Sequence, residues 1–258
     1  MTRVPFIAGN WKMNPTTGME AARLLSDIRD RIEAIDGVQK GVFPPAIYLK
    51  TALEILDGSG IVVGAQNCHW EQKGAFTGEL SPVMLRELVD WVIIGHSERR
   101  QYFGETDETV NRRVKGALAA GLRVIMCIGE TREERAQGRT NDVLIRQLRK
   151  GLEGVDLPDD FVIAYEPVWA IGTGDAATGE QANDAIALIR EDVAYLYGAE
   201  KAASVRIQYG GSVTDENVAE FLEQPEVDGA LVGGASLKPD VFARIVETAA
   251  EIASARAR

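Results

Sequence analysis

Short, almost continuously apolar runs recur along the chain at fairly even spacing. A parallel strand that is covered on both faces has this pattern, whereas a strand with one exposed face alternates apolar and polar residues. We therefore predict eight buried parallel strands, although the second run has a weak pattern and is assigned partly by its spacing. The runs lie at 4–10, 38–43, 60–67, 91–96, 122–130, 161–167, 205–211 and 229–234.

Longer segments between these runs have apolar residues at every third or fourth position, which is the pattern of one face of an amphipathic helix. Thr178 stands three residues before Gln181, the spacing of a capping box, and Pro239 suits the first turn of a helix. Both residues predict where a helix begins. The clearest helical segments are 105–120, 131–153, 179–197 and 239–254.

The order of these segments predicts the fold class. Eight strands, each followed by a helix, divide the 258 residues into units of about 32 residues, which fits an α/β protein with a closed (β/α)8 TIM barrel. No Pro/Ser-rich linker or low-complexity run interrupts the chain, so we expect a single domain over 1–258. An open doubly wound sheet is the alternative, but its usual Gly-rich turn is missing after the first run, which continues as AGNWKMN.

Charge and composition narrow the possible partners. The net charge of −11 argues against nucleic acid or an anionic membrane surface, because both require a basic face. The apolar runs are shorter than the roughly 18 residues of a membrane helix, and the N-terminal run is too short for a signal peptide. Cys68 and Cys127 are too few for a disulfide framework. We therefore expect a soluble, cytoplasmic protein.

Polar residues follow several of the apolar runs, and the active site of a (β/α)8 barrel forms at these C-terminal strand ends. Glycine-rich turns follow the last two strands, where barrels commonly bind phosphate through backbone N–H groups. The two histidines and the lack of a CxxC or HExxH pattern predict no metal site. The candidates are Asn10 and Lys12 after the first run, His96 after the fourth, Glu166 after the sixth, Ser212 after the seventh, and Gly233 and Gly234 after the eighth.

Each candidate taken alone also has a purely structural interpretation. Lys12 could be a solvated charge, Glu166 an ion-pair partner, and His96 a hydrogen-bonded residue at a helix start. Their shared position at strand ends favours an active site instead. Pro167 biases the backbone of Glu166 towards an extended shape. A helix that begins at His96 would disfavour the imidazolium form of this residue.

Eight segments between residues 8 and 237 resemble the triosephosphate isomerase family in sequence and in order. This resemblance implies an enzyme of glycolysis and gluconeogenesis that interconverts D-glyceraldehyde 3-phosphate and dihydroxyacetone phosphate by proton transfer through an enediolate. Because the reaction involves no redox change and no hydrolysis, we expect no cofactor. The segments are AGNWKMN, GAQN, GAFTGE, IIGHSERR, CIGE, YGGSV, LVGGASL and AYEPVWAIGTG, of which the last is highly specific.

The resemblance also implies roles for individual residues. Glu166 would be the base that moves a proton between adjacent carbons, and His96 the electrophile that moves protons at the oxygens, as is known for this family. Lys12 and Asn10 would bind the substrate and stabilise the enediolate, and Glu98 would lie beside them. The phosphate would be bound by the backbone N–H groups of Gly172, Ser212, Gly233 and Gly234.

The segment 167–178 resembles the lid of this family. It would be hinged at both ends, with Ala170 and Ile171 at an apolar tip, and its closure would exclude water. After GTG the family commonly has a lysine and a small residue, whereas this chain has Asp175 and Ala176. This departure concerns the opening and closing of the lid rather than the chemistry.

The loop 67–79 resembles the loop through which this family forms homodimers. By resemblance, Thr77 would reach the active site of the partner subunit. The aromatic residues Trp70 and Phe76 on a long loop give weak independent support for an interface. His69, in the same loop, has no obvious chemical partner in the sequence.

Two other functions compete with this interpretation. Another phosphate-binding barrel enzyme, such as a sugar-phosphate epimerase or an aldolase-like lyase, is the first, but a Schiff-base lyase would need a lysine where the sixth strand has Glu166. A barrel that only binds or adheres is the second. Loss of Lys12, His96 or Glu166 would have indicated it, and all three are present.

Overall fold

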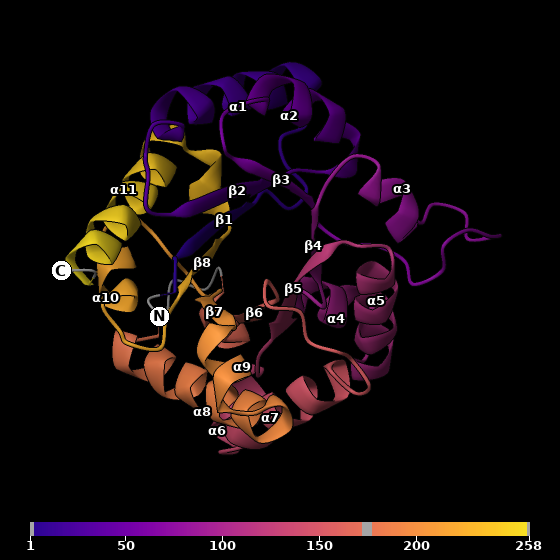
Figure 1. Cartoon of the computed structure of the whole chain (residues 1–258), viewed down its shortest axis with the longest axis vertical. Helices are drawn as coiled ribbons and strands as arrows, with labels where there is room; N and C mark the ends of the chain where they lie inside the picture. The colour runs from indigo at the N-terminus through magenta and orange to yellow at the C-terminus, as the bar shows by residue number, and fades with distance from the viewer. Residues whose placement is uncertain (1–2, 172–176, 257–258) are drawn as a thin grey trace.

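A computed structural model describes residues 3–171 and 177–256 of the chain. Eight parallel strands form a closed barrel in sequence order, and pairing of Phe6 with Gly229 joins the last strand to the first (Figure 1). The predicted (β/α)8 barrel is therefore confirmed. The strands are β1 (Phe6–Asn10), β2 (Gln39–Phe43), β3 (Val62–Ala65), β4 (Trp91–Ile94), β5 (Arg123–Ile128), β6 (Val162–Tyr165), β7 (Arg206–Tyr209) and β8 (Gly229–Val232).

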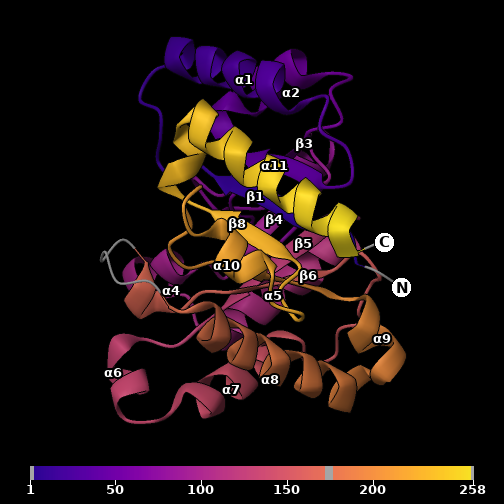
Figure 2. The ribbon, with the colours of Figure 1, turned by 90° about the vertical axis from the view of Figure 1, so that its left-hand side faces the viewer.

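Helices surround the barrel as an outer ring (Figures 1 and 2). The α-helices are α1 (Gly18–Ile32), α2 (Leu49–Leu56), α3 (Pro82–Arg86), α4 (Ser97–Phe103), α5 (Asp107–Ala119), α6 (Arg132–Ala136), α7 (Thr140–Gly151), α8 (Gly179–Tyr197), α9 (Ala199–Ser204), α10 (Val218–Leu222) and α11 (Pro239–Arg256). Three 3₁₀ turns accompany them, namely η1 (Ala46–Tyr48), η2 (Val168–Ala170) and η3 (Gly234–Leu237).

Two of the predicted helix starts are confirmed, and one predicted helix is wrong in its extent. Thr178 and Gln181 form the capping box of α8, and α11 begins at Pro239. The segment 131–153 contains two helices, α6 and α7, rather than one. Gly138 lies between them with a φ of 68°, a left-handed conformation that interrupts the helical path.

The core has two layers because each strand buries both of its faces. Side chains that point outward, such as Ile7, pack against the helices, and those that point inward fill the barrel. This double burial explains why the strands are apolar throughout rather than alternating. The inner layer consists of Phe6, Ala8, Phe43, Trp91, Ile93, Ile125, Cys127, Val162, Ala164 and Leu231.

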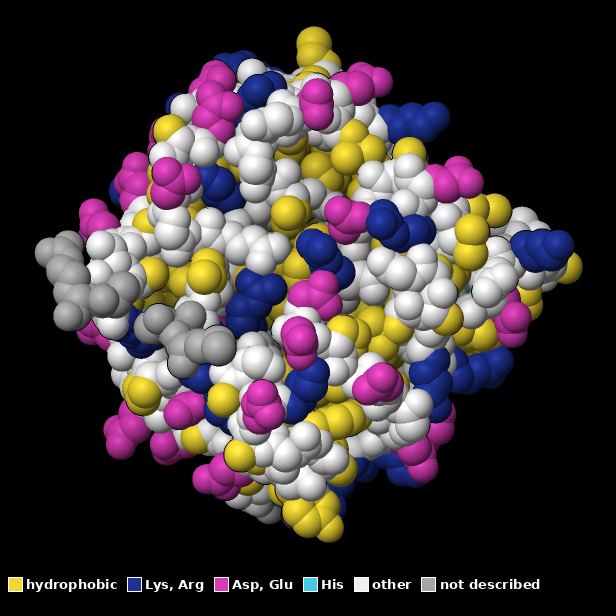
Figure 3. Space-filling view, viewed as in Figure 1, with side chains coloured by type: hydrophobic (Ala, Val, Ile, Leu, Met, Phe, Trp, Pro, Cys, Tyr) yellow, Lys and Arg dark blue, Asp and Glu magenta, His cyan; other side chains and the backbone are white. Residues whose placement is uncertain are grey.

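The two ends of the barrel differ. The chain termini lie at the end opposite to α4 and α6 (Figure 2). Arg206 closes this N-terminal end from the inside, since its guanidinium lies 5.4 Å from the centre of the Phe6 ring and donates a hydrogen bond to Gln39. Basic and acidic side chains are interspersed on this face (Figure 3). The C-terminal strand ends form the opposite, open mouth.

Candidate active site

The candidate residues converge on one cavity at the C-terminal ends of the strands. The cavity has a volume of about 430 Å³ and is also lined by Ile171 and Leu231. Gly172 lies outside the described residues. The candidates that line the cavity are Asn10, Lys12, His96, Glu166, Ser212, Gly233 and Gly234.

Glu166 follows β6 and is 2% exposed. Its Oε1 lies 2.9 Å from Nε2 of His96, and its Oε2 accepts a hydrogen bond of 2.8 Å from the backbone N–H of Ser97. Burial raises the pKa of this carboxyl, but the imidazole and the Ser97 N–H outweigh burial, so the pKa is lowered. The carboxylate is therefore ionised, which is the form that a general base requires.

Two glycines make room for Glu166. A Cβ at Gly129 would lie 1.7 Å from the carbonyl oxygen of Glu166, and a Cβ at Gly210 would lie 2.9 Å from its Cγ. Sequence analysis did not assign a role to Gly129. The segment CIGE contains it, but nothing in the sequence shows that a glutamate from another strand approaches this backbone.

His96 precedes α4 and acts as its N-cap, as predicted. Its Nδ1 accepts a hydrogen bond of 3.2 Å from the N–H of Glu98, so in the neutral ring Nε2 carries the proton and donates it to Glu166. Burial lowers the pKa of His96, but the adjacent Glu166 carboxylate reverses this and raises it. The start of a helix by itself lowers the pKa of a histidine, so the sequence predicted a shift in the opposite direction. The sequence did not show that the Glu166 carboxylate contacts the ring.

Lys12 has an unusual backbone conformation for a residue other than glycine, with a φ of 54°. Its N–H donates to Oδ1 of Asn10 at 3.0 Å, and its carbonyl accepts from the side-chain amide of Gln66 at 2.8 Å. Its Nζ lies 2.6 Å from Oε1 of Glu98, which agrees with the expected place of Glu98 beside the site. Sequence analysis missed the role of Gln66, although GAQN was recognised as a motif.

The glycine-rich turns after β7 and β8 form the other end of the cavity. A Cβ at Gly211 would lie 2.2 Å from the hydroxyl oxygen of Tyr209, so this turn requires glycine. The N–H of Ser212 donates to the carbonyl of Ala170 at 3.2 Å. A Cβ at Gly233 would lie 3.5 Å from Cε of Lys12, which brings the lysine next to this end.

The segment that follows Glu166 begins with the 3₁₀ turn η2. Ala170 in this turn is fully buried, because the turn packs against the loop that contains Ser212, and the place of Ala170 and Ile171 at the tip of a lid stays a prediction. Trp169 donates a hydrogen bond of 2.8 Å to Glu130. Sequence analysis assigned no role to Glu130. Residues 172–176, which include Asp175, lie outside the described residues.

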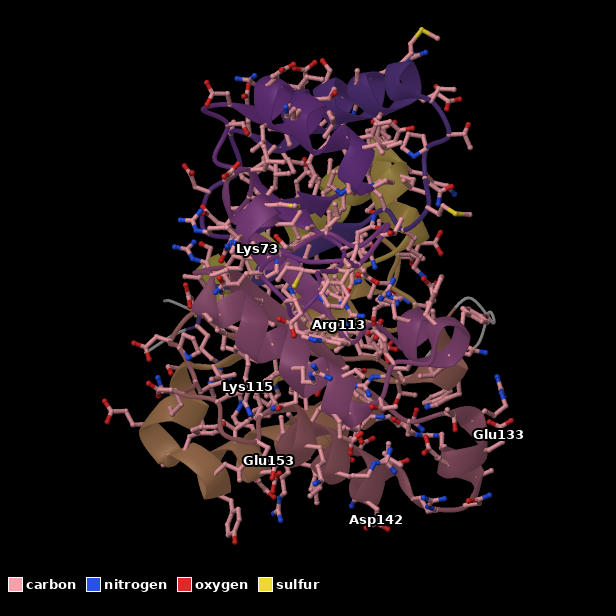
Figure 4. All side chains as sticks on the ribbon, turned by 90° about the vertical axis from the view of Figure 1, so that its right-hand side faces the viewer. Lys73, Arg113, Lys115, Glu133, Asp142 and Glu153 are labelled. Carbon is pink, nitrogen blue, oxygen red and sulfur yellow. The ribbon has the colours of Figure 1, made fainter. Side chains whose placement is uncertain are left out.

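The loop 67–79 extends away from the barrel between β3 and α3 (Figure 1). His69 is buried within it, with its ring centre 4.2 Å from that of Trp70 and 4.3 Å from that of Phe76. Its Nδ1 accepts a hydrogen bond from the N–H of Glu71. His69 therefore has structural partners within the loop, which the sequence did not indicate. Arg113 of α5 donates to the carbonyl of Cys68 and so ties the loop to the outer helices (Figure 4).

Residues 3–171 and 177–256 contain no group of three or more His, Cys, Asp or Glu side chains arranged to hold a metal ion. In the same part of the chain, no helix combines the length and apolar character needed to span a membrane.

Comparison with known proteins identifies the family. The family model of triosephosphate isomerase matches residues 5–249, which is nearly the whole chain. The chain belongs to the triosephosphate isomerase family. Membership in the triosephosphate isomerase family makes the chain an isomerase, and it sets aside the epimerase, lyase and non-enzymatic alternatives.

Several curated triosephosphate isomerases are about half identical to the chain. The enzyme of Carboxydothermus hydrogenoformans is 52% identical over 248 residues, which cover 95% of this chain and 98% of the relative. That of Thermoanaerobacter pseudethanolicus is 50% identical over 247 residues, covering 95% and 99%. That of Alkaliphilus metalliredigens is 52% identical over 248 residues, again covering 95% and 99%.

Proposed function

We propose that the cavity interconverts D-glyceraldehyde 3-phosphate and dihydroxyacetone phosphate, with Glu166 as the base and His96 as the proton donor to the substrate oxygens. The observation that carries this assignment is the buried contact of 2.9 Å between the ionised carboxylate and the imidazole Nε2. The two groups are oriented towards the same point, where one can act on a carbon and the other on the neighbouring oxygen.

The proton transfers follow from this geometry. The Glu166 carboxylate removes a proton from the carbon next to the carbonyl while Nε2–H of His96 donates to the carbonyl oxygen, which gives an enediol. His96 then takes a proton back from the neighbouring hydroxyl, and Glu166 gives its proton to the former carbonyl carbon, so that both residues return to their starting forms. Substrate entry separates Glu166 from His96 and removes the contact that raises the pKa of the imidazole. Burial and the N–H donated to Nδ1 then favour the neutral ring.

Lys12 and Asn10 would stabilise the negative charge that develops on the enediolate oxygens. The pairing of Lys12 with Glu98 holds Nζ in the cavity, and the hydrogen bond that the backbone N–H of Lys12 donates to Oδ1 of Asn10 fixes the strained backbone of Lys12. A preorganised cation needs little reorientation when charge develops, which is the condition for effective electrostatic stabilisation.

The phosphate would occupy the glycine-rich end, bound by the N–H groups of Ser212, Gly233 and Gly234 together with that of Gly172. In this structure the N–H of Ser212 donates a hydrogen bond to the carbonyl of Ala170. Phosphate binding therefore has to replace this hydrogen bond, and this exchange would couple the phosphate to movement of η2.

We also propose a homodimer formed through the loop 67–79, with Thr77 reaching the partner's site. Large apolar side chains are exposed on this loop and next to it, namely Phe76 at 43% on the loop and Met84 at 56% and Phe103 at 68% beside it. A second cavity, lined by Lys12, His96 and Phe103 among others, lies beside the active site and could receive the partner loop. A monomeric mass in solution at micromolar concentration, with full activity, would contradict this proposal.

The protein would be cytoplasmic and would form a single domain over 1–258, and it would have no nucleic acid or membrane as a partner.

The decisive experiment is a coupled assay in which glyceraldehyde 3-phosphate is the only carbon substrate and formation of dihydroxyacetone phosphate is followed. The expected result is isomerisation that depends on Glu166 and His96. Absence of turnover by the purified wild-type protein would refute the function.

A further inference from the structure

The side chains that line the active-site cavity carry more acidic than basic groups. Two lysines line the cavity, Lys12 and Lys238, against three carboxylates, Glu166, Asp215 and Glu216. Lys12 is further neutralised by its contact of 2.6 Å with Glu98. The whole chain also carries a net charge of −11. A dianionic substrate therefore meets a site in which one of the two lysines is already paired.

Lys238 differs from the other basic residues around the cavity. Arg244 is paired with Asp215 at 2.6 Å, and Lys12 with Glu98. The ammonium of Lys238 makes no hydrogen bond or ion pair within the described part of the chain, and its electrostatic interaction with Asp215 is weaker than that of Arg244, which is hydrogen-bonded to this carboxylate. It is therefore the cation on the cavity wall that is available to a ligand.

The backbone holds Lys238 at the phosphate end of the cavity. The residue directly follows η3, which begins at Gly234, and its N–H donates to the carbonyl of Ala235 at 3.2 Å. Its carbonyl accepts from Phe242 in the first turn of α11 at 2.9 Å. The main chain is thus fixed on both sides, while the exposed side chain lies on the cavity wall.

We propose that Lys238 is a positioning residue that attracts the phosphate group of the substrate and retains it beside the N–H groups of Gly233 and Gly234. This inference rests on the proposed function of the cavity. Lys238 takes no part in proton transfer, which occurs at the opposite end. Its effect is therefore on capture and binding of the phosphorylated substrate rather than on the chemical step.

Two carboxylates, Asp215 and Glu216, line the same cavity as Lys238 and carry the opposite charge. Asp215 faces it from the loop after β7, but the hydrogen bond with Arg244 compensates the charge of this carboxylate. Glu216 is exposed on the cavity rim, and no ion pair involving it occurs among the described residues. Removal of the Glu216 charge should therefore have the opposite effect to removal of the Lys238 charge.

The experiment compares Lys238→Met with the wild type in the isomerase assay. At low ionic strength we expect kcat/KM for glyceraldehyde 3-phosphate to fall about fivefold, with kcat changed by less than about twofold. At 1 M salt the difference should shrink to less than about twofold, because the Debye length is then about 3 Å. The inhibition constant of inorganic phosphate should rise in parallel.

Three further variants separate a local role from a general charge effect. Lys115→Met removes the same charge from an exposed position on α5, away from the cavity (Figure 4), and should leave kcat/KM within about 1.5-fold of the wild type. Lys238→Arg should restore most of the loss, since it restores the charge. Glu216→Gln should raise kcat/KM by up to about twofold at low salt.

Phosphate-free glyceraldehyde provides the last readout. Its slow turnover should be unchanged in Lys238→Met, since it has no dianion to attract. Equal losses with both substrates, a loss confined to kcat, or the same result for Lys238→Met and Lys115→Met would overturn the proposal. An inactive wild-type protein would instead refute the proposed function, so the two failures are distinguishable.

Discussion

At one end of the cavity, Glu166, His96 and Lys12 present charged or titratable side chains, whereas at the other end Gly211 and Gly233 belong to turns that present backbone N–H groups. At the first end Glu166 and His96 are buried and lie 2.9 Å apart, while Lys12 is partly exposed and contacts Glu98. The second end has open space at positions such as Gly234, where a Cβ would have no atom within 4 Å.

The difference reflects two chemical tasks. Moving a proton requires groups whose pKa values are adjusted by their neighbours, and the Glu166–His96 contact provides such an adjustment in both residues. Holding an anion requires only donors that keep their protons, and backbone N–H groups meet this need without adding a titratable charge. The two ends should therefore respond differently to substitution.

The largest effect is expected for Glu166→Gln. This change keeps the shape but removes the base, so kcat should fall by about 10³-fold or more, while inhibition by inorganic phosphate at the other end is largely kept. Steady-state kinetics and phosphate inhibition measure the two responses. Glu133→Gln, on the exposed helix α6 (Figure 4), is the matched control and should be neutral. More than about a tenth of wild-type kcat in Glu166→Gln would remove Glu166 as the base.

A smaller effect of a different kind is expected for Gly211→Ala. The new Cβ would lie 2.2 Å from the Tyr209 hydroxyl, so the turn has to shift, at a cost of about 1–3 kcal/mol in stability. KM should rise by about tenfold, more than kcat falls. Thermal unfolding of Gly234→Ala is the control, because its Cβ meets no atom and the melting temperature should be kept. Wild-type KM and stability in Gly211→Ala would show that this turn does not shape the phosphate end.

The third prediction concerns pH and tests the pairing at the chemical end. The pKa of Glu166 is lowered from 4.5, so its contribution to stability is present above that value and is lost as the pH falls. The pKa of His96 is raised from 6.5, so its contribution is complete below that value and is lost as the pH rises through the folded pKa. Between about pH 4.5 and 6.5 the charged forms of Glu166 and His96 therefore both contribute to stability.

Glu166→Gln should therefore lower the melting temperature most between about pH 4.5 and 6.5. The difference from the wild type should shrink by about 2 °C or more at pH 9, since 1 kcal/mol corresponds to about 2–4 °C in a protein of this size. Calorimetry across this range measures it, with Glu133→Gln as the reference. A difference that does not change with pH would mean that the contact is not a charged pair.

The smallest effect is expected from chelation. Neither end of the cavity needs a metal ion in the proposed chemistry, so isomerase activity should be unchanged after dialysis against EDTA. The assay is the coupled one described above, with added divalent ions as the reverse test. A large loss that a divalent ion restores would contradict the assignment of substrate stabilisation to Lys12 and to backbone N–H groups.

The comparison of the two ends also explains which parts of the site were predictable. His96 and Glu166 stand directly after apolar strands, so a barrel topology places them at one mouth without further information. The residues that contact and hold the active-site residues were not predictable. Gly129 and Gln66 contact Glu166 and Lys12 from other strands, and a lone sequence contains no record of which backbones approach so closely.

The sequence by itself determined the local features of this protein. The Thr178 capping box and the helix start at Pro239 follow from interactions between residues close in the chain, and the continuously apolar strand runs are readable in the sequence pattern itself. Only the tertiary structure decided the direction of the His96 pKa shift and the pairing of Lys12 with Glu98. Those depend on charges that lie far apart in sequence, and electrostatic interactions depend on distance in space and on burial, which closure of the barrel sets.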